Sequence, residues 1–87
     1  INEDTLKEEL EQDDYFKVER YENIDLSDTG KFYGALVTDE ATNMAMMYYR
    51  IKYNDKAISF IAYRKLGFPQ AEEESIRAML STFKGIK

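Results

Sequence analysis

The side chains that could do acid–base chemistry in this 87-residue chain are mainly carboxylates, because it contains 17 Asp and Glu residues and no His. Without His the chain lacks the usual general base and the commonest metal ligand. It also has no Cys, which excludes disulfides, thiolate metal sites and cysteine nucleophiles. Catalysis would therefore need a pair of carboxylates at a defined spacing.

One tripeptide, Asp28-Thr29-Gly30, has the sequence that carries the activating acid of aspartic proteases. In those enzymes hydrophobic residues bound the tripeptide on both sides. Here Ser27 precedes it and Lys31 follows it. Ser, Asp, Thr and Gly in succession are also typical of a turn, and we interpret the stretch as a turn between two strands.

Other acidic motifs fail similar tests. Four residues match the residue types at the start of a calcium-binding loop, namely Asp25, Ser27, Thr29 and Gly30. The twelfth position of such a loop would be Leu36 in place of the bidentate glutamate. Residues 13–14 and 72–74 are acidic clusters without partners at a defined spacing, and they indicate a solvated edge and a helix start. The glycine-rich phosphate and dinucleotide motifs are absent. We expect no enzyme, no cofactor and no metal site.

The charge is distributed unevenly along the chain. Residues 1–30 carry 11 acids and 3 bases, a net charge of −8, whereas residues 31–87 carry 6 acids and 9 bases, a net charge of +3. The overall acidity argues against nucleic-acid binding, which favours basic domains. The asymmetry predicts either mutual attraction of the two parts or a solvated acidic tail. We divide the chain into an acidic helix or tail over 1–13 and one domain over 14–87.

The pattern of apolar residues predicts two helices and four strands. A weak helix is expected over 3–12, with Thr5 and Glu8 as a capping box and Leu6 and Leu10 as its apolar stripe. Strands are expected over 15–24, 31–38, 44–53 and 56–65. In the first of them, Phe16 and Val18 alternate with Lys17 and Glu19.

A second helix is expected after Pro69, which fits its first turn. Four apolar residues recur at helical spacing, Ile76, Met79, Leu80 and Phe83. Lys84 and Gly85 fit the carboxyl-terminal end of this helix. The fold class is therefore predicted to be α+β, a four-stranded antiparallel sheet packed against the C-terminal helix, with a weak N-terminal helix.

A two-residue turn at Asn54-Asp55 would pair residues whose numbers sum to 109 and so assign the faces of the sheet. One face collects Met47, Tyr49, Ile51, Ile58, Phe60 and Ala62, and we expect the C-terminal helix to cover it. The other face holds Met46, Tyr48, Arg50, Lys52, Ser59, Ile61, Tyr63 and Lys65. Tyr, Met and Arg are enriched at interfaces. This mixed face is covered by the N-terminal helix or a neighbouring chain, or it is a binding surface, or it is an ordinary half-exposed sheet face. The candidate partner-binding residues are Met46, Tyr48, Arg50, Lys52, Ile61 and Tyr63.

The last third of the chain, AISFIAYRKLGFPQAEEESIRAMLSTFKGIK, runs from a strand through a Gly/Pro link into a helix that ends Ser81-Thr82-Phe83-Lys84. This order resembles the carboxyl-terminal end of PsbP-like domains and of related DcrB-type bacterial lipoproteins. The resemblance implies an antiparallel sheet flanked by helices and an accessory or binding role. It also implies export, which leaves room for a lipid anchor upstream of Ile1. No functional residue carries over.

Two hypotheses for the function follow. In the first, the chain is a non-catalytic binding or accessory domain, the soluble part of an exported bacterial lipoprotein, which binds a protein partner or a second copy through the mixed face. A cytoplasmic location stays open, and no membrane span is expected because no apolar run approaches about 18 residues. In the second, the chain is a small acidic inhibitor or immunity-type protein that blocks a basic surface.

Overall fold

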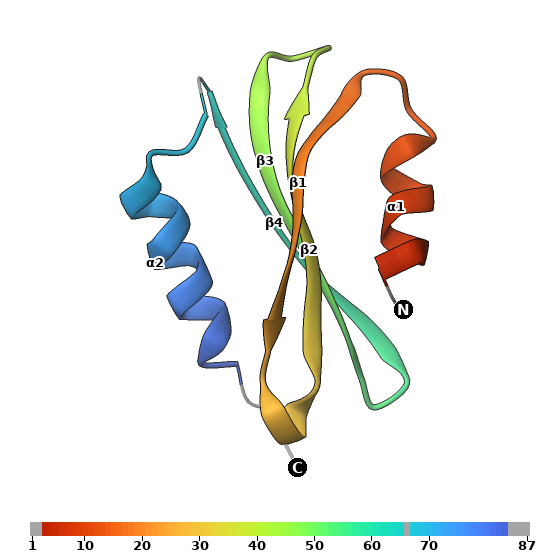
Figure 1. The fold of residues 1–87 in the computed structure, drawn as a ribbon, viewed down its shortest axis with the longest axis vertical. Coiled ribbons are helices and arrows are strands. Elements are labelled where there is room, and N and C mark those ends of the chain that lie inside the picture. Colours follow the sequence, from red (N-terminus) through yellow and green to blue (C-terminus); the bar gives the residue numbers. More distant parts are fainter. Residues whose placement is uncertain (1–2, 66, 84–87) are drawn as a thin grey trace.

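The computed structural model describes residues 3–65 and 67–83 and shows an α+β fold. The elements in order are α1 (Glu3–Glu11), β1 (Phe16–Asp25), the short 3-10 turn η1 (Ser27–Thr29), β2 (Lys31–Asp39), β3 (Met44–Tyr53), β4 (Lys56–Lys65) and α2 (Gln70–Ser81). The strands form one antiparallel sheet in the order β1-β2-β3-β4. Figure 1 shows α1 and α2 on opposite sides of this sheet. The predicted fold class is confirmed.

The hairpin of β3 and β4 has the register that the sequence predicts. Its pairs run from Tyr53 opposite Lys56 to Met44 opposite Lys65 without interruption. Asn54 and Asp55 connect the strands with φ angles of 50° and 61°, the left-handed conformation that two-residue hairpin turns require. The assignment of alternate residues to the two faces is confirmed with it.

The face toward α2 contains one of two buried clusters. Its fully buried members are Phe32, Met47, Tyr49, Ile51 and Leu80, against which Ile76 and Phe83 pack. Met79 was expected to pack here too, but half of its surface is exposed. The reason is that Arg77 of α2 pairs with Glu22 of β1, so the helix presents its Arg77 flank to the sheet and turns the Met79 flank to solvent.

The C-terminal end of α2 comes earlier than the sequence suggested. The helix ends at Ser81, and the amides of Thr82 and Phe83 donate to the carbonyls of Met79 and Leu80 at 3.2 and 3.1 Å. The expected end residues Lys84 and Gly85 lie outside the described residues.

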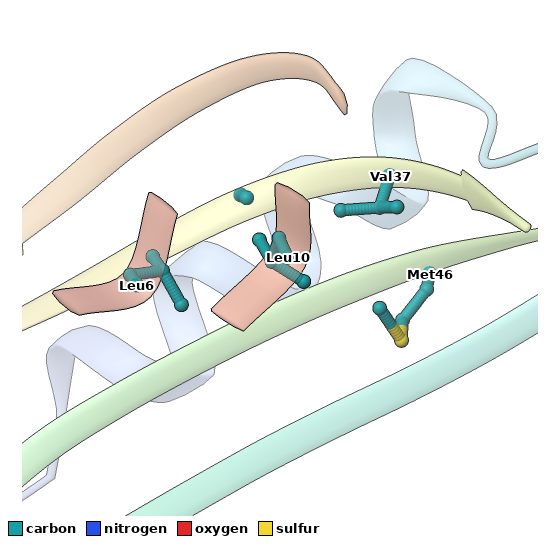
Figure 2. Close-up of a cluster of buried hydrophobic side chains, with 5 residues drawn as sticks. Leu6, Leu10, Val37 and Met46 are labelled. Carbon is teal, nitrogen blue, oxygen red and sulfur yellow. The ribbon is translucent and has the colours of Figure 1, made fainter. Parts of the chain in front are cut away.

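The opposite face contains the second cluster, which consists of Leu6, Leu10, Ala35, Val37 and Met46. Figure 2 shows Leu6 and Leu10 of α1 side by side over the sheet, with Leu10 the nearer of the two to Val37 and Met46. A nine-residue helix is marginal on its own, and burying each leucine supplies about 1.5–3 kcal/mol. Docking on the sheet therefore holds α1 in place. The predicted capping box is wrong, because the helix begins at Glu3 and Thr5 lies inside it.

Strand β1 contains a bulge at Glu19 that the sequence analysis did not predict. Val18 opposes Val37 and Arg20 opposes Leu36, so Glu19 is the extra residue. Phe16 and Val18 lie on the α1 face as expected. Beyond the bulge the parity of the strand changes, and Arg20 and the following even-numbered residues lie on the α2 face.

Gly34 of β2 allows an aromatic ring to lie across its backbone. It is paired with Tyr49 of β3, and a Cβ at position 34 would lie 2.1 Å from Cδ1 of that ring. The Tyr49 side chain is fully buried there. The close approach that an in-strand glycine suggests is therefore made by a cross-strand tyrosine.

Candidate binding site

Helix α1 covers only part of the mixed face. Its leucines pack on residues of β2 and β3, with Phe16 and Val18 of β1 alongside. Strand β4 contributes nothing to this cluster, and its two large apolar side chains on the same face stay open to solvent. Ile61 is 44% exposed and Tyr63 is 53% exposed. The face is thus neither fully covered nor fully open.

A cleft of about 190 Å³ lies where α1 stops short of β4. It is lined by Glu9, Leu10, Phe16, Met46, Tyr48, Ile61 and Tyr63. Pockets that enclose whole small molecules start at roughly 300 Å³. The size and the apolar, aromatic lining therefore suit one or two side chains of a partner better than a cofactor.

The structure brings four of the six predicted site residues together in this cleft. Met46 is 2% exposed and lies in the core beneath it. Tyr48 is half-buried, and Ile61 and Tyr63 are exposed on the β4 side. Met46 therefore shapes the cleft, whereas the two β4 side chains are the ones a partner could reach.

Arg50 does not line the cleft, because its guanidinium is engaged within the chain. It donates to the Glu9 carboxylate and to the Tyr48 hydroxyl, and its Nε donates to Ser59 Oγ at 3.3 Å. The guanidinium carbon also lies 5.4 Å from the centre of the Tyr48 ring. The pairing of Glu9 with Arg50 ties α1 to β3, so the acidic and basic parts of the chain do attract each other. The sixth predicted residue, Lys52, lies at the hairpin end, where its Nζ is 3.9 Å from Oδ1 of Asp55.

Three lining residues were missed by the sequence analysis, namely Glu9 and Leu10 of α1 and Phe16 of β1. The signal for Leu10 was its i, i+4 spacing from Leu6, which marks one face of a docked helix. Tyr15 is also exposed beside this region and makes an edge contact with the Phe16 ring at 4.6 Å. The pKa of Tyr15 is raised, chiefly by the Asp13 carboxylate and slightly by Tyr63, which lies across the cleft.

The carboxylates that come together on the other face are occupied by arginines. Arg77 Nη1 lies 3.4 Å from both Glu22 and Glu73, and Arg20 also donates to Glu73. The Tyr49 hydroxyl donates to Glu22. Burial, followed by this contact, raises the pKa of Tyr49, so its proton is retained. The network joins α2 to β1 and faces away from the cleft.

A second hollow of about 420 Å³ lies between the β2–β3 loop and Gly67. Its lining consists of Thr38, Asn43, Met44, Ala45 and Gly67. This lining offers neither a charge nor an aromatic ring for recognition. Among residues 3–65 and 67–83, no group of three or more acidic side chains could hold a metal ion.

No helix in the described part of the chain is long and apolar enough to cross a membrane. The chain matches no protein-family model, no curated protein and no solved structure. The cleft and its surroundings therefore supply the evidence from which a function can be inferred.

Proposed function

We propose that this protein is a non-catalytic binding domain that recognises a protein partner through the cleft between α1 and β4. The observation that carries the proposal is the joint exposure of Ile61 and Tyr63 at the edge of an apolar cleft. Two residues apart on one strand, they point to the same face. A partner's side chain in the cleft would contact both.

The chemistry of the cleft supports this role. Interfaces draw most of their binding energy from a few aromatic and apolar side chains in well-packed pockets. Tyr48, Tyr63 and Ile61 supply such side chains here. The pairing of Glu9 with Arg50 fixes α1 against β3 before any partner binds, and a site fixed in advance loses less entropy on binding.

We extend the proposal to the cellular location of the domain and to its membrane anchor. On the resemblance of the last third to PsbP-like and DcrB-type domains, the domain is the soluble part of an exported bacterial lipoprotein anchored upstream of Ile1. Labelling of the full-length protein with a fatty-acid analogue in its host, followed by fractionation, tests this setting. An unlabelled protein in the cytoplasmic fraction would contradict it and leave the cleft proposal intact.

The cleft is tested by selecting binders from a random ten-residue peptide library against the immobilised chain. Tyr63→Glu is the site variant. Met79→Glu is the matched control, because Met79 is 50% exposed, against 53% for Tyr63, and lies on α2 across the sheet. We expect the selected peptides to lose at least tenfold in affinity for Tyr63→Glu and to keep it for Met79→Glu. Peptides that bind both variants equally would refute the site.

A second candidate, the acidic inhibitor, draws on the charge of −8 over residues 1–30. Glu9 and Glu22 are taken up by Arg50 and Arg77, whereas Asp4 and Glu8 are exposed on α1. Binding through these acids would weaken steeply with salt, because the Debye length falls from roughly 14 Å to 4 Å between about 50 and 500 mM. Affinity for a basic partner that is unchanged over this range would exclude the candidate.

A further inference from the structure

We infer that the partner enters as an extended segment with acidic ends, which pairs with the outer edge of β4 as a fifth antiparallel strand. This inference rests on the proposed function and names the form and charge of the partner at the same site. Three observations carry it: the open edge of β4, the sequence of that strand and the sign of its charges.

Strand β4 lies at the end of the sheet, where β3 is its one paired neighbour among the described residues. The pairing with β3 is regular over all ten residues of β4. In an antiparallel pair every second residue directs its N–H and C=O away from the neighbour. Counted from the two-residue turn, residues 57, 59, 61 and 63 direct these groups to the free edge.

The central stretch of β4 lacks the features that normally protect an edge strand. Natural edges are protected by charges, prolines, bulges or a covering element. Residues 57–63 read AISFIAY, seven positions without a charge or a proline. Of the ten side chains of β4, only Phe60 and Ala62 are half-buried and the others are exposed. An edge with these properties favours pairing with another extended segment.

The charges at the two ends of β4 select an acidic partner. Lys56 begins the strand and Arg64 and Lys65 end it, and the strand contains no acid. Arg64 is paired with Glu72 of α2, which leaves the two exposed lysines to attract carboxylates. A partner strand with Asp or Glu at both ends would oppose them.

A second copy of the chain is disfavoured by the same charges. Residues 57, 59, 61 and 63 face the free edge in both copies, so two β4 strands can pair antiparallel only with odd residues opposite odd ones and even opposite even. The register centred on Phe60 would place Lys56 opposite Arg64 at both ends, and any register would bring together two strands that each carry three bases and no acid. Like charges directly opposite each other destabilise a strand pair. The occupant is therefore a segment of a different protein.

An added strand would also reach the cleft. Neighbouring strands lie about 4.8 Å apart, and alternate side chains point to one face. A large apolar side chain opposite Ile61 would lie on the α1 face and extend across Ile61 and Tyr63 toward the cleft. Backbone pairing along β4 would then supply affinity, and the cleft would supply selectivity for that side chain.

The experiment uses the ten-residue library peptides selected against the intact chain. We expect their sequences to be enriched in Asp and Glu at both ends and in β-branched or aromatic residues at alternate positions between them. The best peptide is then synthesised in two further forms. In one, the alternate backbone nitrogens that would face β4 are N-methylated. In the other, the terminal acids are replaced by Lys.

We expect each form to bind at least tenfold more weakly than the parent peptide. An N-methylated form that binds as well as the parent would refute strand addition, and a Lys form that binds as well would refute the acidic partner. Both results leave the cleft proposal standing if Tyr63→Glu still abolishes binding. Sedimentation of the free chain as a dimer that Ile61→Lys dissociates would make the occupant a second copy and overturn the inference.

Discussion

The two edge strands of the sheet, β1 and β4, differ in regularity, in charge and in the elements that cover them, although both have ten residues. Strand β1 has a bulge at Glu19, a mixture of charges along its length and ion pairs that join it to α2. Strand β4 has a regular register and a central stretch without charge. Helix α1 packs beside β1 and leaves β4 uncovered.

The difference between the two edges indicates that β1 contributes mainly to stability and that β4 is the edge available for binding. The partly buried network of Tyr49, Glu22 and Arg77 joins β1 to β3 and α2. Three of the five exposed large hydrophobic side chains among the described residues lie on β4, namely Ile58, Ile61 and Tyr63. Substitutions on the two sides should therefore affect different measurements.

The largest effect is expected for Gly34→Ala. The added Cβ would meet the buried Tyr49 ring at 2.1 Å, so the ring would have to move within a packed core. Overpacking of this kind should lower the free energy of unfolding by about 3 kcal/mol, measured by chemical denaturation. If the clash with the Tyr49 ring causes this loss, Gly34→Ala should lower the free energy of unfolding far less in a Tyr49→Ala background. An equal cost in both backgrounds would point to another cause.

The next largest effect is expected for one ion pair of β1, compared with one ion pair of β4. Glu22 accepts hydrogen bonds from Tyr49 and Arg77 and is largely shielded from solvent. Glu22→Gln should therefore lower the free energy of unfolding by about 1.5–2 kcal/mol. Arg64 and Glu72 are both more than 40% exposed, so Arg64→Gln should change it by less than about 0.5 kcal/mol. Equal losses, measured by the same denaturation, would remove the contrast between the two edges.

A third comparison places a lysine on each edge. Ile61→Lys should reduce the affinity of the selected peptides at least tenfold, about 1.4 kcal/mol, because a charge would replace the side chain beside the cleft. Asn23→Lys, at an exposed position of β1, should leave the affinity unchanged. Titration calorimetry of both variants measures the difference. Weakened binding by Asn23→Lys alone would assign binding to the other edge.

The smallest effect is a pH dependence. The pKa of Tyr49 is raised in the folded chain, so the protonated hydroxyl adds stability that is complete below the unfolded value of about 10 and is lost as the pH rises toward the folded value. Between about pH 10 and 11 the wild type should lose roughly 1 kcal/mol more than Tyr49→Phe. Identical slopes in urea denaturation at these pH values would show that Tyr49 does not contribute.

Much of the fold could be predicted because its signals are local. The turn at Asn54-Asp55 fixes the register of β3 and β4, and that register assigns every residue of the hairpin to a face. The stripe of α2 predicts Ile76, Leu80 and Phe83 as core. Met79 was assigned wrongly because the rotation of α2 depends on Arg77 and Glu22, which are 55 residues apart.

The bulge and the cleft could be predicted less well because both depend on contacts between distant segments. The apolar positions of β1 switch from even numbers at Phe16 and Val18 to an odd number at Tyr21, and this switch is the signal for the bulge. The cleft exists because Leu6 and Leu10 dock α1 over β2 and β3 and no farther. The spacing of two leucines predicts a buried stripe but not the strand on which it lies.

We propose that β4, and not β1, is the edge of the sheet that binds the partner. The most direct test is amide hydrogen exchange measured by NMR on the chain alone and with the best selected peptide. We expect the amides of residues 57, 59, 61 and 63 to exchange fast in the free chain and to become protected in the complex, while the amides of β1 do not change. Protection confined to β1, or a bound peptide that leaves all four amides of β4 unprotected, would contradict it.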